Sequence, residues 1–204
     1  MPSIVGCSAI LLLGCDMGRI ERISVRSAVQ LIHDEHVALL GGIDWSALNR
    51  LADCVEKSQR VFTLGRGRSG LVMAMFAMRL VHLGKEAHVV GEATVPAAKE
   101  GDLLVVASAS GTTDTVCSVL EAAGEVGVTR VGLTASPHSR IAGQLDCCVA
   151  VITGQGLSTT AGTRQFRGSL FEQAVLLLTD AVIIRLADQN VTWREMSERH
   201  ANLE

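Results

Sequence analysis

Short apolar runs rich in valine and leucine alternate with stretches of helical periodicity along much of this chain, and this alternation restricts its fold more than any other feature. The strand-like runs lie at residues 61–64, 88–90, 103–107, 130–134 and 148–152. Helical patterns over residues 71–83, 112–126 and near 138–142 stand between them. Strands joined through helices pair in parallel, with right-handed crossovers. We therefore predict an α/β fold, a three-layer αβα sandwich around a five-stranded parallel sheet.

Further helical patterns flank these strands. Residues 20–40 repeat apolar positions at helical spacing until Gly41-Gly42, and Asp44 is a capping residue for a second helix that reaches Lys57. Residues 167–187 predict a long helix with few charges, which is typical of burial in a core or in an oligomer interface. The Gly-, Ser- and Thr-rich stretch 153–166 before it has no periodicity and is interpreted as a loop that could act as a lid.

Composition limits the class of protein. The chain has 204 residues, which suits one domain with a sizeable core. A net charge of −3 without a basic run, and only 3% aromatic residues, argue against a nucleic-acid partner. The apolar stretch near residues 10–13 is too short to span a membrane and lacks a preceding positive charge. We predict a dispensable extension at residues 1–19, a single domain over 20–204, and no membrane partner.

Cysteine and histidine positions give little sign of a metal site. None of the six cysteines forms a CxxC pair, so neither zinc binding nor a disulfide framework is expected, and a cytoplasmic location is favoured. The pair Cys147-Cys148 lies in an apolar run and is interpreted as buried strand. His33 and His36 are one helical turn apart without a third ligand, so we interpret them as exposed helix residues. No metal and no cofactor are predicted.

Two glycine-containing loops follow strand-like runs and are the candidate ligand site. The first, Gly65-x-Gly67-x-x-Gly70, formally matches a dinucleotide-binding fingerprint, but tight turns near any phosphate favour glycine. Arg66, Arg68 and Ser69 make it polar enough for a small phosphorylated sugar. Parallel sheets bind ligands at the carboxyl ends of their strands, where both loops stand.

The second loop carries the more specific pattern. Hydroxyls of Ser108, Ser110 and Thr113 surround Gly111 at the start of a predicted helix, and Thr112 completes the run. Free backbone N–H groups at a helix N-terminus bind anions, so the pattern indicates a cradle for a phosphate monoester. The same residues could instead cap only their own helix. The neighbouring glycine loop favours the phosphate interpretation.

These motifs resemble the SIS (sugar isomerase) domain family. Within that family the chain is similar to the 6-phospho-3-hexuloisomerases from about residue 20 onward. Four segments carry this similarity: Gly65–Gly70, residues 77–84, residues 168–173 and the terminal residues 199–204. Residues 165–167 depart from that resemblance, as does Ala107–Ser110, which is less glycine-rich. The resemblance implies a flavodoxin-like SIS fold, interconversion of D-arabino-hex-3-ulose 6-phosphate and D-fructose 6-phosphate in the ribulose monophosphate pathway of formaldehyde assimilation, no cofactor, and a homotetramer or homodimer.

Site roles combine residue chemistry with this resemblance. Glu172 stands at the start of an otherwise apolar helix, and the resemblance implies that it moves the proton, although an acid in a first turn also suits the helix dipole. His200 is the second candidate proton carrier, because imidazole titrates near neutral pH, and the resemblance implies that the tail carrying it reaches a neighbouring subunit's site. Substrate contacts are expected from two sets of residues: Gly67, Arg68 and Ser69 in the first loop, and Ser108, Ser110, Gly111, Thr112 and Thr113 in the second.

Three alternatives remain open. Another SIS isomerase would act on arabinose 5-phosphate or sedoheptulose 7-phosphate. A non-catalytic sugar-phosphate sensor would need a DNA-binding module, for which the first residues are too few and insufficiently basic. The interpretation as a nicotinamide-binding protein is supported by the first glycine loop alone.

Overall fold

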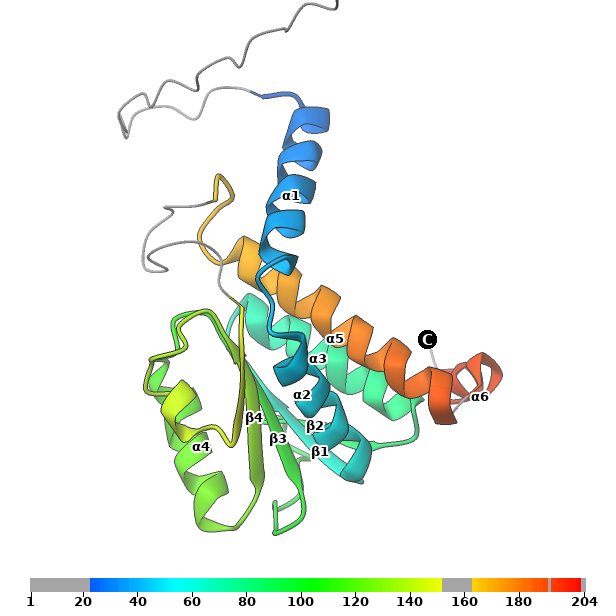
Figure 1. Ribbon diagram of the computed structural model, residues 1–204. Coiled ribbons are helices and arrows are strands. Elements are labelled where there is room, and N and C mark those ends of the chain that lie inside the picture. Colours follow the sequence, from blue (N-terminus) through cyan, green and yellow to red (C-terminus); the bar gives the residue numbers. More distant parts are fainter. Residues whose placement is uncertain (1–22, 152–162, 191, 203–204) are drawn as a thin grey trace, which may run out of the picture.

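The computed structural model describes residues 23–151, 163–190 and 192–202. Its centre is an all-parallel sheet of five strands in the order β2-β1-β3-β4-β5 (Figure 1). The strands are β1 (Arg60–Leu64), β2 (Glu86–Val89), β3 (Leu103–Ser108), β4 (Thr129–Thr134) and β5 (Cys147–Ala150). The central strand β3 is buried along its whole length, as expected for a strand covered on both faces. The predicted parallel sheet is confirmed.

Helices cover both faces of the sheet. The helices are α1 (Val25–Leu40), α2 (Trp45–Lys57), α3 (Arg68–His82), α4 (Asp114–Glu125), α5 (Ser169–Asn190), α6 (Trp193–Glu198) and the 3₁₀ helix η1 (Ala142–Gln144). Leu103 and Val105 of β3 pack with α2, α3 and α5, whereas Leu104 and Val106 pack with α4. This alternation follows from the two-residue period of a strand. The three-layer αβα sandwich is therefore confirmed.

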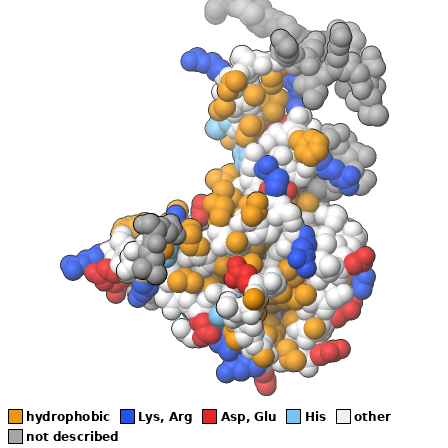
Figure 2. Space-filling view, turned by 180° about the vertical axis from the view of Figure 1, so that it is seen from behind, with side chains coloured by type: hydrophobic (Ala, Val, Ile, Leu, Met, Phe, Trp, Pro, Cys, Tyr) orange, Lys and Arg blue, Asp and Glu red, His pale blue; other side chains and the backbone are white. Residues whose placement is uncertain are grey.

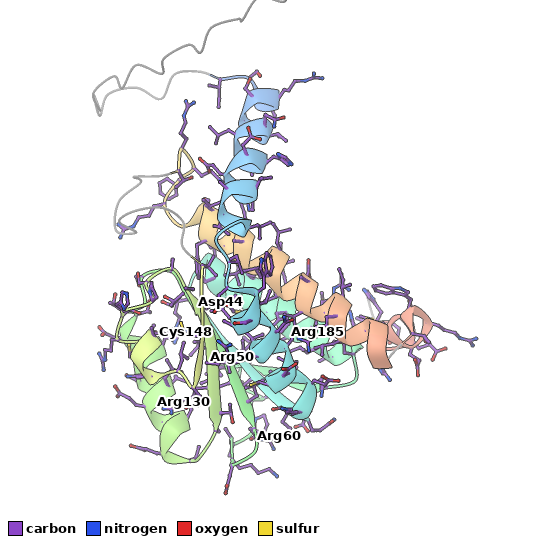
Figure 3. All side chains as sticks on the ribbon, in the orientation of Figure 1. Asp44, Arg50, Arg60, Arg130, Cys148 and Arg185 are labelled. Carbon is purple, nitrogen blue, oxygen red and sulfur yellow. The ribbon has the colours of Figure 1, made fainter. Side chains whose placement is uncertain are left out.

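Polar contacts begin α2 and join it to α5 within the same helical layer. Asp44 accepts hydrogen bonds from the backbone N–H groups of Ser46 and Ala47, so it caps α2 as predicted. Arg185 of α5 points toward α2 (Figure 3), where it pairs with Asp53 and donates to the carbonyl oxygen of Asn49 at 3.0 Å. These contacts hold α2 and α5 together beside their shared apolar core.

Several predicted boundaries need correction. The helix expected from residue 71 begins at Arg68, because Gly67 takes the N-cap position with a φ of 57°. The short helix expected near residues 138–142 is instead η1, three residues long and displaced toward the C-terminus. The helix α6 was not predicted, although Thr192 and Glu195 form a capping box that its sequence shows.

His36 also differs from expectation. It is buried, not exposed, and its Nδ1 lies 2.7 Å from the carbonyl oxygen of Ile32. His33, one helical turn earlier, faces solvent, so the two histidines lie in different environments. Among the described residues, no cluster of three metal-binding side chains is found.

Some predictions fall outside the described residues. The extension at residues 1–19 lies there entirely, and so does most of the loop at 153–166, of which only residues 163–166 are described. Within the described ranges, no helix is long and apolar enough to cross a membrane. The four cysteines described there, Cys54, Cys117, Cys147 and Cys148, are free thiols.

Candidate functional site

The two predicted loops meet at the carboxyl edge of the sheet. β1 lies between β2 and β3, so the chain leaves β1 and β3 toward opposite faces of the sheet. Such a point, where the strand order reverses, is where open parallel sheets bind ligands. The first loop joins β1 to α3 on one face, and the second joins β3 to α4 on the other (Figure 1).

Close backbone packing explains the glycines of the first loop. A Cβ atom on Gly65 would lie 2.7 Å from backbone atoms of Ser69 and Gly70, so the strand end rests directly on the first turn of α3. Gly67 begins that helix with a φ of 57°, in the left-handed region that glycine favours. Ser69 is buried beneath the turn with 8% exposure. The glycines of this motif therefore allow a tight turn at the start of a helix. Dinucleotide-binding fingerprints contain the same kind of turn, which explains the formal match.

The second loop gathers hydroxyls around one glycine. Ser108 Oγ lies 3.4 Å from Thr113 Oγ1, and the backbone N–H of Thr112 donates to Ser110 Oγ at 3.3 Å. Gly111 has a φ of 67°, and a Cβ there would lie 1.9 Å from Ser139 Oγ. The loop is thus pressed against the segment after β4, and Gly111 is required by both its backbone angle and this contact.

The two helices that start at these loops begin differently from others in the fold. Ser24, Asp44 and Thr192 cap α1, α2 and α6 through side-chain hydrogen bonds. Gly67 and Thr113, at the starts of α3 and α4, make no side-chain capping bond. The first N–H groups of a helix have no partner one turn back within it. In α3 and α4 no N-cap side chain satisfies them, and although the N–H groups of Gly70 and Val116 bond backbone carbonyl oxygens, the remaining ones suit a ligand. Both helix dipoles also favour an anion between the loops.

Glu172 and Arg68 form an ion pair between the first loop and α5. Arg68 Nε donates to Glu172 Oε2, which places the carboxylate at the start of α3. The Glu172 side chain is only 13% exposed, whereas that of Arg68 is 64% exposed. A carboxylate held largely out of water beside an accessible cation is suited to moving a proton next to a developing negative charge.

Arg66 joins the two loops, and it is not among the contacts expected from the sequence. Its Nε donates to Thr115 Oγ1 at 3.1 Å, so this side chain crosses from the β1 loop to the first turn of α4. The sequence indicated only that Arg66 adds to the polarity of the first loop, not that its side chain reaches α4. Arg66 adds a cation where α4 already favours an anion.

His200 is not brought to these loops within one chain. Its ring stacks on that of His82, with centroids 5.1 Å apart, at the C-terminal end of α3. Burial, Arg79 and His200 together lower the pKa of His82 below its ordinary value. The 15 residues of α3 separate this histidine pair from Arg68 by about 21 Å. A role for His200 in the site thus requires a second chain.

Comparison with known proteins identifies the family. The model of the SIS domain matches residues 55–176, which contain all five strands, both loops and Glu172. The 3-hexulose-6-phosphate isomerase of Mycobacterium gastri is 41% identical over 184 residues, covering 88% of this chain and 92% of that protein. The 3-hexulose-6-phosphate isomerase of Bacillus subtilis is 41% identical over 160 residues, covering 76% and 86%.

A solved structure agrees with this match. A hypothetical protein of Methanococcus jannaschii, whose structure is described as inferring a molecular function of 3-hexulose-6-phosphate isomerase, superposes with a TM-score of 0.75. It is 26% identical, and the alignment covers 87% of this chain and 99% of that chain. The chain therefore belongs to the SIS domain family. The predicted resemblance to its 6-phospho-3-hexuloisomerases is confirmed, and with it the prediction that the chain is an isomerase.

Proposed function

We propose that this chain interconverts D-arabino-hex-3-ulose 6-phosphate and D-fructose 6-phosphate through an enediol. The observation that carries the proposal is the Glu172–Arg68 pair beside two uncapped helix N-termini. The names of relatives that are 41% identical support this choice of substrate. In this account the reaction belongs to the ribulose monophosphate pathway of formaldehyde assimilation and takes place in the cytoplasm.

The phosphate occupies the space between the loops in this proposal. Hydroxyls of Ser108, Ser110 and Thr113 donate to its oxygens, together with free N–H groups of α4. Gly111 and Thr112 supply close backbone approach, while Gly67 and Ser69 bound the sugar from the first loop. A phosphate held at this end fixes the distance of the carbonyl carbon from Glu172.

Proton transfer is assigned to Glu172. Its carboxylate takes the proton from C2 of the 3-ketose, the C2–H electron pair forms the C2–C3 double bond, and the C3 carbonyl oxygen gains a proton to give the enediol. Loss of the O2 proton then restores a carbonyl at C2 while C3 receives a proton. The atoms balance without an external oxidant. Arg68, once it turns from the carboxylate, stabilises the enediolate oxygen.

We further propose that the chain works as a homo-oligomer, a homotetramer or a homodimer. Leu71, Met75 and Met78 recur on one face of α3 and are 69%, 45% and 44% exposed. The N-terminal part of α1 projects from the body of the molecule (Figure 1) and carries exposed valines, with hydrophobic side chains visible along it in Figure 2. A lone helix of this length is only marginally stable in water, so we expect a second copy of the chain to pack against the exposed face of α1.

This assembly gives His200 its proposed role. Because the histidine lies at the far end of α3 within its own chain, we assign it to the Glu172 site of a neighbouring copy. An imidazole there would exchange protons with the sugar hydroxyls near neutral pH. Light scattering of the purified chain tests the oligomer, and a monomer with full activity would refute both parts.

The substrate is tested by direct assay. Purified enzyme is given hexulose 6-phosphate made by a separate synthase, and fructose 6-phosphate is measured with a coupled dehydrogenase. We expect turnover of this substrate and at least about a hundredfold lower kcat/KM for arabinose 5-phosphate and sedoheptulose 7-phosphate. Arabinose 5-phosphate lacks the hydroxymethyl carbon next to the reacting pair, and in sedoheptulose 7-phosphate the reacting carbons lie farther from the phosphate. Comparable turnover of either alternative would show that the substrate is wrong.

A further inference from the structure

Glu35 of α1 lies outside the loops described above, yet it contacts the chain that leads to Glu172. The segment 163–165 precedes α5 and is the first described part after residue 151. Its three residues all donate hydrogen bonds to the Glu35 carboxylate. Thr163 Oγ1 donates to Oε2 at 2.6 Å, the backbone N–H of Arg164 donates to Oε1 at 2.8 Å, and Gln165 Nε2 donates to Oε2 at 2.8 Å.

Both carboxylate oxygens are therefore engaged by one short segment. Burial opposes ionisation of Glu35, but the bonds from Thr163, Arg164 and Gln165 outweigh it and hold the pKa of this carboxyl below its ordinary value. Charge-assisted bonds of this kind are stronger than those between neutral groups. Within the described part of the chain, the segment makes no side-chain hydrogen bonds except to Glu35 and to its own Thr163.

The clamped segment continues directly into the surroundings of Glu172. After Gln165, the N–H of Ser169 donates to the carbonyl oxygen of Phe166 at 3.0 Å, which closes a turn. Gly168 within that turn has a φ of 89° and lies against the Glu172 carboxylate, since a Cβ on it would be 3.2 Å from Oε1. The turn also starts α5, because the N–H of Glu172 donates to the carbonyl oxygen of Gly168.

The carboxylate of Glu172 is thus located from two sides. Arg68 holds Oε2 from the first loop, and the Gly168 turn bounds Oε1. The hydrogen bonds from residues 163–165 to Glu35 hold the chain directly before this turn. A displacement of about 1 Å in a reacting group can reduce a rate by about a hundredfold, so an anchor that directly precedes this turn bears on catalysis.

We infer that Glu35 is a positioning residue: by clamping residues 163–165 to α1, it fixes the Gly168 turn against which the Glu172 carboxylate rests. The inference rests on the proposed function of Glu172. It assigns to α1 a part in the chemistry, in addition to the part in the assembly that is proposed for its exposed valines.

The test compares Glu35→Gln with Asp34→Asn, a neighbouring acid on the same helix whose carboxylate, within the described residues, makes hydrogen bonds only to Gln30 and His33 of α1. Calorimetry with fructose 6-phosphate gives the number of binding-competent sites and the Kd, and the isomerase assay gives kcat per competent site. For Glu35→Gln we expect kcat per site to fall by about ten- to a hundredfold. Stoichiometry, Kd and KM should stay within about twofold of wild type, because the phosphate loops are untouched. Asp34→Asn should match wild type.

Two further variants keep the result decisive if Glu35→Gln folds poorly. Thr163→Val and Gln165→Leu each remove one donor while leaving α1 unchanged, and each should give a smaller loss of the same kind. A loss of competent sites with unchanged kcat per site, or full kcat in both donor variants, would overturn the inference. An inactive wild-type enzyme would instead refute the proposed function, and the inference would fall with it.

Discussion

Replacing Gly111 by alanine tests whether the second loop is shaped by its contact with Ser139. The new Cβ would lie 1.9 Å from Ser139 Oγ and 2.3 Å from Ser139 Cβ, so the two segments must separate. The φ of 67° adds a cost of about 1–2 kcal/mol for an L-residue. Overpacking adds about 1–3 kcal/mol, for a total near 2–5 kcal/mol in the free energy of unfolding.

Gly67→Ala is a matched control for this effect. Gly67 has a similar φ of 57°, but nothing lies within 4 Å of its Cβ position. It should therefore lose only a backbone cost, which is about 1–3 kcal/mol because its ψ of −134° lies outside the left-handed helical basin. Urea unfolding of both variants gives the comparison, and calorimetry with fructose 6-phosphate shows whether separation of the loop from Ser139 weakens phosphate binding. We expect a Kd at least about tenfold higher for Gly111→Ala than for wild type.

A double-mutant cycle isolates the contact. Ser139→Gly removes both colliding atoms, so Gly111→Ala made in that background should lose only the backbone cost. The coupling between the two changes should be about 1–3 kcal/mol. Equal destabilisation by Gly111→Ala and Gly67→Ala, with no coupling to Ser139, would refute the reasoning.

Three further results are expected. Arg66→Gln should raise the Kd for fructose 6-phosphate about tenfold and weaken its dependence on salt, whereas Arg50→Gln on α2 should change neither; equal Kd values would remove Arg66 from the site. The Glu35 carboxyl has a lowered pKa in the folded state, so its stabilising effect is present above its unfolded pKa of about 4.3 and is lost as pH falls through the folded pKa. Urea unfolding between about pH 5 and 3 should therefore show a shallower loss of stability for Glu35→Gln than for wild type, and parallel curves would contradict this. Gly132→Ala on β4 should destabilise by about 1–3 kcal/mol, because its Cβ would lie 2.6 Å from Val106 Cγ2; an unchanged urea midpoint would show that the sheet yields at no cost.

The sheet and its main helices could be predicted because burial imposes a local pattern. The all-apolar run of β3 reflects burial on both faces, and Asp44 marks the start of α2 by its own hydrogen bonds. The loop glycines could also be predicted, because a close approach of two backbone segments or a positive φ restricts a position to glycine. Boundaries at Arg68 and η1 were missed because they depend on loop packing, which has no periodicity.

Contacts between distant segments had no sequence signal. Arg66 meets Thr115 across 49 positions, and Glu35 meets Thr163 across 128. Such pairs are set by how the sheet brings loops together, which no single window of sequence encodes. The burial of His36 has the same origin, because helical spacing alone did not show which positions of α1 are covered in the fold. The position of His200 likewise depends on the docking of α6 against α3.

The most direct test of the account is the isomerase activity of Glu172→Gln. Glu125→Gln, an exposed acid at the end of α4, serves as the matched control. The account predicts that Glu172→Gln lowers kcat by about a hundred- to ten-thousandfold while fructose 6-phosphate still binds, and that Glu125→Gln keeps wild-type kcat. A kcat for Glu172→Gln within about threefold of wild type would show that another group moves the proton, and would contradict the central claim.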